Sequence, residues 1–206
     1  MPCRVKICGI TNLEDALTAC EYGADALGFV FYKKSPRYID PEVANGILAK
    51  LPPFVVPIAL FVDAQSDEIN EVISGHSRWM IQFHGNESEK ECLSYNRPYI
   101  KALRVKEGDD LLAATQTYLS ANAILLDAYK AGVPGGTGEV FNWTLIPNNL
   151  PLPVILAGGL TPENIAHAVE QVAPYAVDVS GGVEASKGLK NKVKVKQFIS
   201  GAKREQ

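Results

Sequence analysis

Two residues with acid–base side chains end apolar stretches of the sequence. Cys8 closes the stretch Arg4-Val5-Lys6-Ile7-Cys8, in which apolar and polar residues alternate as on a β-strand, and Gly9 follows directly. Lys6 shares the strand face of Cys8, and a nearby ammonium favours the thiolate form of a cysteine. Cys8 is therefore a candidate general base or nucleophile, and the alternative is a small buried apolar side chain.

Asp127 ends the apolar run Ala123-Ile-Leu-Leu-Asp127, where solvation alone is a poor explanation for an acid. Partial burial raises the pKa of a carboxyl group, so Asp127 is a candidate general acid. A helix cap or a loop hydrogen bond is the alternative. A base and an acid on different strands could act on two atoms of one substrate.

Further polar side chains lie on or at the ends of predicted strands. His84 follows Gln82 on one strand face and is a candidate binding residue, although a core histidine with satisfied hydrogen bonds is the simpler interpretation. Asp63 could contribute to a site or cap the turn that follows it. We expect Lys6 and Asp178 to point into one interior and form an ion pair, which could be structural or catalytic.

Glycine pairs follow the last two predicted strands, and they favour a phosphate site. The segments are Gly158-Gly159 and Ser180-Gly181-Gly182. Glycine lets backbone N–H groups approach an anion closely, and helix N-termini favour negative charge. Turns also need glycine, so each pair alone is weak evidence, and the argument depends on both pairs together.

Arg37 lies in a polar loop between Pro36 and Tyr38. Its guanidinium could grip a substrate carboxylate through two hydrogen bonds, and solvation at the surface is the alternative. A second loop, residues 132–138, is rich in glycine and proline. It could be a mobile lid or only a connection.

The elements that must position these residues repeat along the chain as strand, then helix. Apolar or alternating runs predict eight strands, at residues 4–8, 26–31, 56–63, 80–85, 99–105, 123–128, 154–160 and 175–182. Alternating strands and helices require a parallel sheet, and eight even units favour closure into an α/β (β/α)8 barrel, a TIM barrel of minimal length. A doubly wound open sheet is the rival, but no dinucleotide fingerprint follows the first strand.

Polar residues predict where several helices begin. Thr11 with Glu14 reads as a capping box, Asp40 precedes a proline, and Asn86 and Thr161 stand at two further starts. Additional helices are expected at 66–74 and 109–119, near residue 142 and from about residue 190. No linker divides the chain, so we expect residues 1–206 to form a single domain. In a barrel of this kind the loops at the carboxyl ends of the strands build the site.

The bulk composition excludes several classes of protein. With 206 residues, 47% hydrophobic, and a net charge of −3, the chain is long enough for one core and is not a general binder of nucleic acid or anionic membranes. No apolar run is long enough to span a bilayer, and no signal-peptide core is visible. The four cysteines show no metal-ligand spacing, which favours a reducing cytoplasm and predicts no metal.

Several motifs together resemble phosphoribosylanthranilate isomerase, a family of tryptophan biosynthesis, and they occur in order along essentially the whole chain. They are Lys6-Ile-Cys-Gly-Ile-Thr11, Gln82-Phe-His-Gly85, Leu125-Leu-Asp127, Gly135-Gly-Thr-Gly138, Leu156-Ala-Gly-Gly-Leu160 and Asp178-Val-Ser-Gly-Gly-Val-Glu184. The resemblance implies an Amadori rearrangement of N-(5-phosphoribosyl)anthranilate to 1-(2-carboxyphenylamino)-1-deoxyribulose 5-phosphate, an aldose–ketose isomerisation without a cofactor.

The resemblance also implies roles for individual residues. Cys8 would be the general base and Asp127 the general acid, and Arg37 would hold the anthranilate carboxylate. Gly159, Gly181 and Gly182 would contribute to the phosphate cradle. The sequence departs from the family pattern where Ser-Gly is usual in place of Gly181-Gly182, and where Pro-Gly is usual in place of Lys187-Gly188.

Two other functions stay open at the level of sequence. One is another sugar-phosphate barrel enzyme, a lyase or an indole-forming synthase, for which Lys6 is the available interior lysine. The other is a barrel that binds a phosphate ligand or a partner without catalysis. Otherwise we expect a small phosphosugar as the sole ligand, no nucleic-acid or membrane partner, and a monomer.

Overall fold

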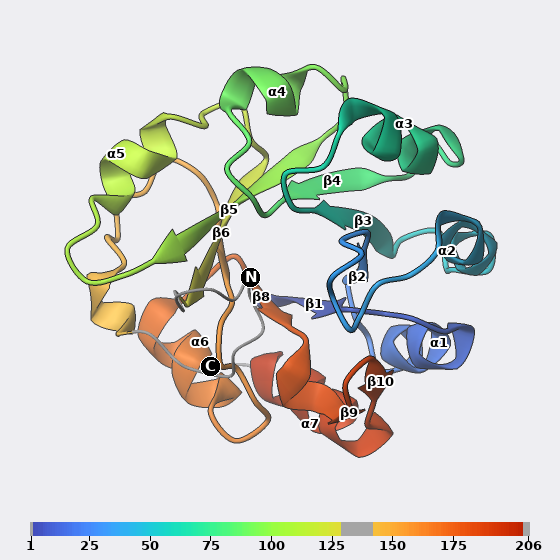
Figure 1. Ribbon diagram of the computed structural model, residues 1–206. Helices are drawn as coiled ribbons and strands as arrows, with labels where there is room; N and C mark the ends of the chain where they lie inside the picture. The colour runs from blue at the N-terminus through green and yellow to red at the C-terminus, as the bar shows by residue number, and fades with distance from the viewer. Residues whose placement is uncertain (1, 129–141, 204–206) are drawn as a thin grey trace.

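The computed structural model describes residues 2–128 and 142–203, and in this part of the chain eight parallel strands form a closed barrel in the order β1 to β8 (Figure 1). Their bounds are β1 Arg4–Cys8, β2 Ala26–Val30, β3 Val56–Phe61, β4 Met80–Phe83, β5 Tyr99–Val105, β6 Ala123–Ala128, β7 Val154–Leu156 and β8 Ala176–Val179. The predicted (β/α)8 fold is confirmed. The glycine-rich loop 132–138 lies outside the described residues.

The strands are buried on both faces, which explains their nearly continuous apolar sequences. Outward residues such as Ile7 and Phe29 join the large core beneath the helices. Inward residues such as Ile58 and Leu125 fill the barrel in a second, smaller cluster. That packed interior leaves room for a ligand only at an end of the barrel.

Helices surround the barrel, as Figure 1 shows. They are α1 Leu13–Glu21, α2 Pro41–Leu48, α3 Ser66–Ser74, α4 Glu89–Leu93, α5 Leu111–Gln116, α6 Ile165–Val172 and α7 Lys192–Ala202, with the short 3-10 helices η1 Trp143–Leu145 and η2 Gly181–Val183. The crossover from β6 to β7 thus has only a 3-10 turn among its described residues, where we expected a short α-helix.

Three predicted helix starts are wrong because a later residue supplies the cap or begins the helix. The side chain of Asn12 caps α1, and Thr11 instead donates to the carbonyl of Gly188. Ser88 caps α4 in place of Asn86. The helix expected at Thr161 begins only at Ile165, after a turn. Side chains that satisfy first-turn N–H groups are common in loops too, so sequence alone does not fix which one caps.

Four predicted strands end two to four residues early, at β3, β4, β7 and β8. His84, Gly158-Gly159 and Ser180 therefore lie in the loops just beyond the strands and not on them. In a (β/α)8 barrel these loops are where functional groups gather.

A small hairpin between β8 and α7 was not predicted. It consists of β9 Glu184–Ser186 and β10 Leu189–Lys190. Asp15 of α1 accepts a hydrogen bond from the backbone N–H of Lys190 at 2.9 Å, and Thr11 donates to Gly188 at 2.6 Å. The hairpin is thereby tied to the start of α1, beside which it lies in Figure 1.

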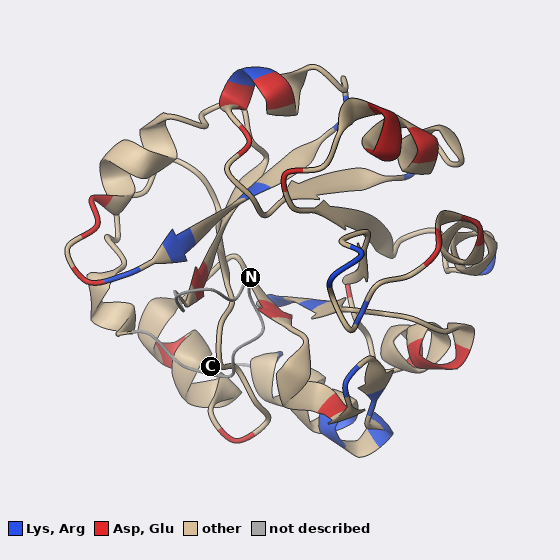
Figure 2. Cartoon of the chain, in the orientation of Figure 1, with Lys and Arg blue, Asp and Glu red and all other residues tan. Residues whose placement is uncertain are grey.

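Charged residues lie mostly on the outer helices and loops of the described chain, with few on the inner strands (Figure 2). No helix in the described segments has the length and apolar character needed to cross a membrane. The same segments contain no cluster of three or more His, Cys, Asp or Glu residues arranged to bind a metal ion.

Candidate active site

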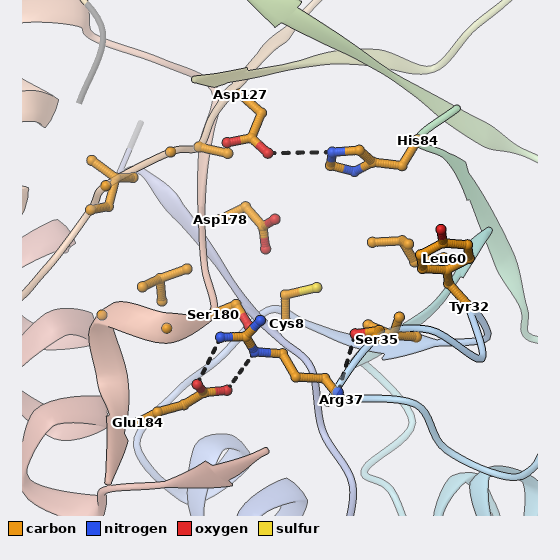
Figure 3. A pocket seen from close by; sticks show the side chains of 18 of the residues that line it. Cys8, Tyr32, Ser35, Arg37, Leu60, His84, Asp127, Asp178, Ser180 and Glu184 are labelled. Atoms are coloured by element: carbon orange, nitrogen blue, oxygen red, sulfur yellow. Dashed lines mark hydrogen bonds and ion pairs between the residues drawn. The ribbon is translucent and has the colours of Figure 1, made fainter. Parts of the chain in front are cut away.

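A cavity of about 350 Å³ opens among the carboxyl ends of the barrel strands, and Figure 3 shows the side chains that line it. All seven predicted site residues line this cavity, namely Cys8, Arg37, His84, Asp127, Gly159, Gly181 and Gly182. Asp63 does not line it. Its carboxylate instead accepts hydrogen bonds from the backbone and side chain of Asn86 in the loop after β4, at 2.6 and 3.2 Å, and not from the turn that follows Asp63.

Cys8 ends β1 with only 5% of its surface exposed, and its thiol faces the cavity. Gly28 of β2 is its neighbour in register, and a methyl group on Gly28 would lie 2.7 Å from Sγ and 3.0 Å from Nζ of Lys6. The missing side chain thus makes room for both groups. Burial raises the pKa of the Cys8 thiol, and the Lys6 and Lys190 ammonium groups oppose that effect.

Lys6 and Asp178 form the predicted ion pair inside the barrel, with Nζ and Oδ1 2.9 Å apart. The two residues are partners in register on β1 and β8, so the pairing follows from closure of the barrel. Burial disfavours the Lys6 ammonium, but Asp178 and Cys8 together outweigh that effect and raise the Lys6 pKa. A lysine held charged in this way is a poor amine nucleophile, which argues against the imine-forming alternative.

Asp127 and His84 face each other across the cavity from β6 and the loop after β4 (Figure 3). Asp127 Oδ2 lies 3.3 Å from Nε2 of His84, and among the described residues this Nε2 atom has no hydrogen-bond partner. The side-chain amide of Gln82 lies 2.9 Å from Nδ1 of His84, on the other side of the ring. His84 is thus buried and held by Gln82, and its Nε2 edge is turned toward Asp127.

Arg37 reaches the cavity from the loop after β2, but it is not free. Its Nε and Nη2 atoms donate to the two carboxylate oxygens of Glu184, at 2.7 and 2.8 Å. Lys190 also donates to Glu184, at 3.1 Å. Burial would raise the pKa of the Glu184 carboxyl, but Arg37 and Lys190 together hold it below its usual value.

Sequence reasoning missed Glu184 and Lys190 as parts of the site. Glu184 is the last residue of the family motif Asp178-Val-Ser-Gly-Gly-Val-Glu184, which begins on β8. That position is the one signal in the sequence that could have identified it. Lys190 gave no signal, because its place depends on the unpredicted hairpin.

The glycine loops form one wall of the cavity. Gly158 and Gly159 have φ values of +83° and +65°, which side chains rarely adopt. Gly182 packs so closely on the carbonyl of Leu160 that any side chain there would collide with it. In the described chain the buried hydroxyl of Ser180 has no hydrogen-bond partner, and it lines the same cavity.

Comparison with known proteins identifies the family. A model described as N-(5'-phosphoribosyl)anthranilate isomerase matches residues 5–201. The chain is 69% identical to N-(5'-phosphoribosyl)anthranilate isomerase of Marinomonas sp. (strain MWYL1) over 98% of its own length and 99% of that protein. The chain belongs to the N-(5'-phosphoribosyl)anthranilate isomerase family. The activity is therefore the isomerisation of phosphoribosylanthranilate in tryptophan biosynthesis, as the resemblance implied.

Solved structures of this isomerase family have the same fold. The enzyme from Thermotoga maritima matches with a TM-score of 0.90 and 45% identity, over 98% of both chains. A second structure, in complex with reduced 1-(o-carboxyphenylamino)-1-deoxyribulose 5-phosphate, matches with a TM-score of 0.84 and 44% identity, again over 98% of both chains. Similarity to 3-hexulose-6-phosphate synthase at 14% identity, with a TM-score of 0.66, shows the barrel fold alone.

Proposed function

We propose that Cys8 is the general base and Asp127 the general acid of the isomerisation. The observation that supports this assignment is that both side chains line one cavity of about 350 Å³ at the same end of the barrel. Each is at least nine-tenths buried, and each comes from a different strand. One small substrate can therefore contact both groups at different atoms.

In the proposed mechanism the Asp127 carboxyl donates its proton to the ribose ring oxygen while the bond from that oxygen to C1 breaks. The nitrogen lone pair of the substrate forms the C1=N bond of an iminium. The Cys8 thiolate then removes the proton from C2, and the electrons of that C–H bond form a C1=C2 bond as the C=N electrons return to nitrogen. The resulting enol tautomerises to the ketone.

Both chemical steps are proton transfers, so the residues above suffice without a metal or an organic cofactor. We therefore class the enzyme as a cofactor-independent intramolecular oxidoreductase that interconverts an aldose and a ketose. The acid and the base serve different atoms, which suits their placement on β6 and β1.

The two anionic ends of the substrate would be held by different groups of the cavity wall. We assign the phosphate to the backbone N–H groups around Gly159, Gly181 and Gly182, whose lack of side chains permits close approach. We assign the anthranilate carboxylate to Arg37. Glu184 takes the Nε and Nη2 side of that guanidinium, so the edge formed by Nη1 and Nη2 is the one left to grip a ligand. His84 would contact the ribose beside Asp127.

The cellular context is also proposed. A soluble biosynthetic family and four free cysteines in the described chain support a cytoplasmic location. We propose that residues 1–206 form one domain and act as a monomer. One related structure is described as the monomeric form of a dimeric Thermotoga maritima enzyme, so light scattering on this protein decides its own state.

The first prediction tests the catalytic pair. Cys8→Ser and Asp127→Asn should each lower kcat by at least about 100-fold, as expected for removal of a general acid or base, while circular dichroism shows an intact fold. The assay follows the loss of phosphoribosylanthranilate fluorescence after the protein is added. Near-normal turnover in either variant removes that residue from its assigned role.

A further inference from the structure

Five charged side chains lie on the side of the barrel formed by β1 and β8, and three of them line the cavity together with Cys8. The five are Lys6, Arg37, Asp178, Glu184 and Lys190. Their side chains are between 2% and 14% exposed, so water screens them little. Charges buried in this way must be matched by opposite charges, so the numbers of cations and anions among the five side chains can be compared.

The five side chains are three cations and two anions, so one positive charge is in excess. Lys6 pairs with Asp178, and Arg37 binds both oxygens of Glu184. Lys190 therefore shares an anion that Arg37 already neutralises, and its other bond, at 3.3 Å, goes to the uncharged carbonyl of Ser180. A thiolate on Cys8 would bring the cluster to zero charge.

Other charged groups that face this cluster do not cancel the excess. Asp15 of α1 accepts hydrogen bonds from the backbone N–H of Lys190 and the side-chain amide of Asn12, and its carboxylate binds the backbone of Lys190 and not its ammonium group. Lys194 of α7 donates to the backbone carbonyl of Glu184 and not to its carboxylate. Asp127 lies on β6 beside His84, with its Oδ2 atom 3.3 Å from Nε2 of that residue, and makes no ion pair with the five charged side chains of the cluster.

We propose that Lys190 is a positioning residue for Cys8, whose buried ammonium supplies the surplus positive charge that stabilises the thiolate. The inference rests on the proposed role of Cys8 as the base. It also gives the hairpin β9–β10 a function, because the hairpin carries both Glu184 and Lys190 and is fixed to α1 at Thr11 and Asp15. Lys190 reaches the thiol through charge and not by touching the substrate.

Charge-changing variants test this assignment by opposite effects. Lys190→Met removes the surplus cation and should raise the pKa of Cys8 by about 1, since nearby charges shift pKa values by roughly 1 to 3. Glu184→Gln removes an anion and should lower the Cys8 pKa. The double variant restores the net charge and should return the pKa toward that of the wild type. If the hairpin had only a structural role, the Cys8 pKa would shift in the same direction in both single variants, or in neither.

The measurement is the rate at which iodoacetamide alkylates Cys8 as a function of pH, followed by mass spectrometry of the Cys8 peptide so that Cys3, Cys20 and Cys92 do not interfere. At neutral pH the Lys190→Met rate should fall about tenfold. Lys190→Arg keeps the charge and should stay near the wild-type rate. Lys192→Met is the matched control, because Lys192 is exposed and forms its ion pair with Glu14, at the surface.

The outcomes are decisive even if one variant folds poorly. An unchanged Cys8 pKa in folded Lys190→Met, or a raised one in Glu184→Gln, overturns the proposal. Alkylation reports the thiolate without turnover, so this failure is distinct from failure of the proposed function. An active Cys8→Ser enzyme would contradict the proposed role of Cys8 as the general base and would leave the alkylation result unaffected.

Discussion

At the scale of single residues, the site depends on how little space surrounds the thiol. Gly28 leaves room for Cys8 and Lys6 at once, and its φ lies outside the range that L side chains rarely adopt. Glycine is therefore required at position 28 because a side chain would make close contacts, and not because the backbone is strained. The neighbouring groups are a buried sulfur and a buried ammonium, and the ammonium cannot move far without losing its ion pair with Asp178.

The second prediction follows for Gly28→Ala. The added methyl group should displace Sγ and Nζ from their present positions and lower kcat by about 10- to 100-fold, because small misplacements of catalytic groups are costly. Thermal unfolding should change far less than turnover. Gly46→Ala in α2 is the control, since a methyl group there meets nothing within 4 Å and turnover should be unaffected. Equal activity of both variants would show that the space at Gly28 does not matter.

The third prediction concerns pH. Burial raises the pKa of Cys8, and the base acts as the thiolate, so the rising limb of kcat/KM should lie above the pH range of an exposed thiol. The rising limb should vanish or move in Cys8→Asp if any activity is left. A limb that is identical in wild type and Cys8→Asp would assign it to another group.

At the scale of elements, the loops after β3 and β4 depend on a buried pair that faces the helices and not the cavity. Lys101 on β5 contacts Glu87 at 2.7 Å and the carbonyl of Gly85 at 2.8 Å. Glu87 in turn accepts N–H groups of Asp63 and Gly85. Both side chains are at least nine-tenths buried, so removal of one partner leaves the other charge unmatched.

The fourth prediction is that Lys101→Met destabilises the protein by about 3 kcal/mol, as expected for a broken buried ion pair. For a chain of this size the midpoint of thermal unfolding should fall by roughly 6 to 12 °C. Glu14→Gln, which breaks the exposed pair with Lys192, should change the midpoint very little. Calorimetry on both variants makes the comparison, and similar midpoints would contradict the role given to Lys101.

The elements were largely predictable from sequence. Strands that are buried on both faces have nearly continuous apolar sequences, and these end near the ends of the observed strands. The bounds of β5 and β6 and of α3 agree with the prediction. The ion pair of Lys6 with Asp178 was predictable because the first and eighth strands of a closed barrel are neighbours, and their register places the two residues opposite each other. The hairpin β9–β10 was not predictable, because its two short strands gain their stability from contacts with α1 that are distant in sequence.

The same reason divides the site into predictable and unpredictable parts. A polar or small residue at the end of an apolar strand is easily recognised in a sequence. Sequence analysis could therefore identify Cys8, Asp127 and the glycine pairs as candidate site residues. Glu184 and Lys190 lie in a polar segment where any charge looks solvated, and only tertiary structure buries them. The expectation for Arg37 was incomplete for this reason, because its partner Glu184 is 147 residues away.

At the scale of the whole molecule, the barrel separates what holds the fold from what binds the ligand. The apolar clusters fill the interior and the layer under the helices, whereas the cavity occupies one end of the strands. A ligand that bridges this end links loops from β1, β2, β6, β7 and β8. Binding should therefore stabilise the entire domain by mass action, and chemistry is not needed for that effect.

The fifth prediction uses this separation. Reduced 1-(o-carboxyphenylamino)-1-deoxyribulose 5-phosphate at about 100 times its Kd should stabilise the wild type by about 2.7 kcal/mol, or roughly 5 to 10 °C in midpoint. Cys8→Ser should keep this shift in full, because it removes a proton acceptor and not a ligand for either anionic end. Arg37→Gln should lose most of the shift at the same ligand concentration, and inorganic phosphate should still stabilise it as well as it does the wild type. An undiminished shift in Arg37→Gln would place the carboxylate elsewhere in the cavity.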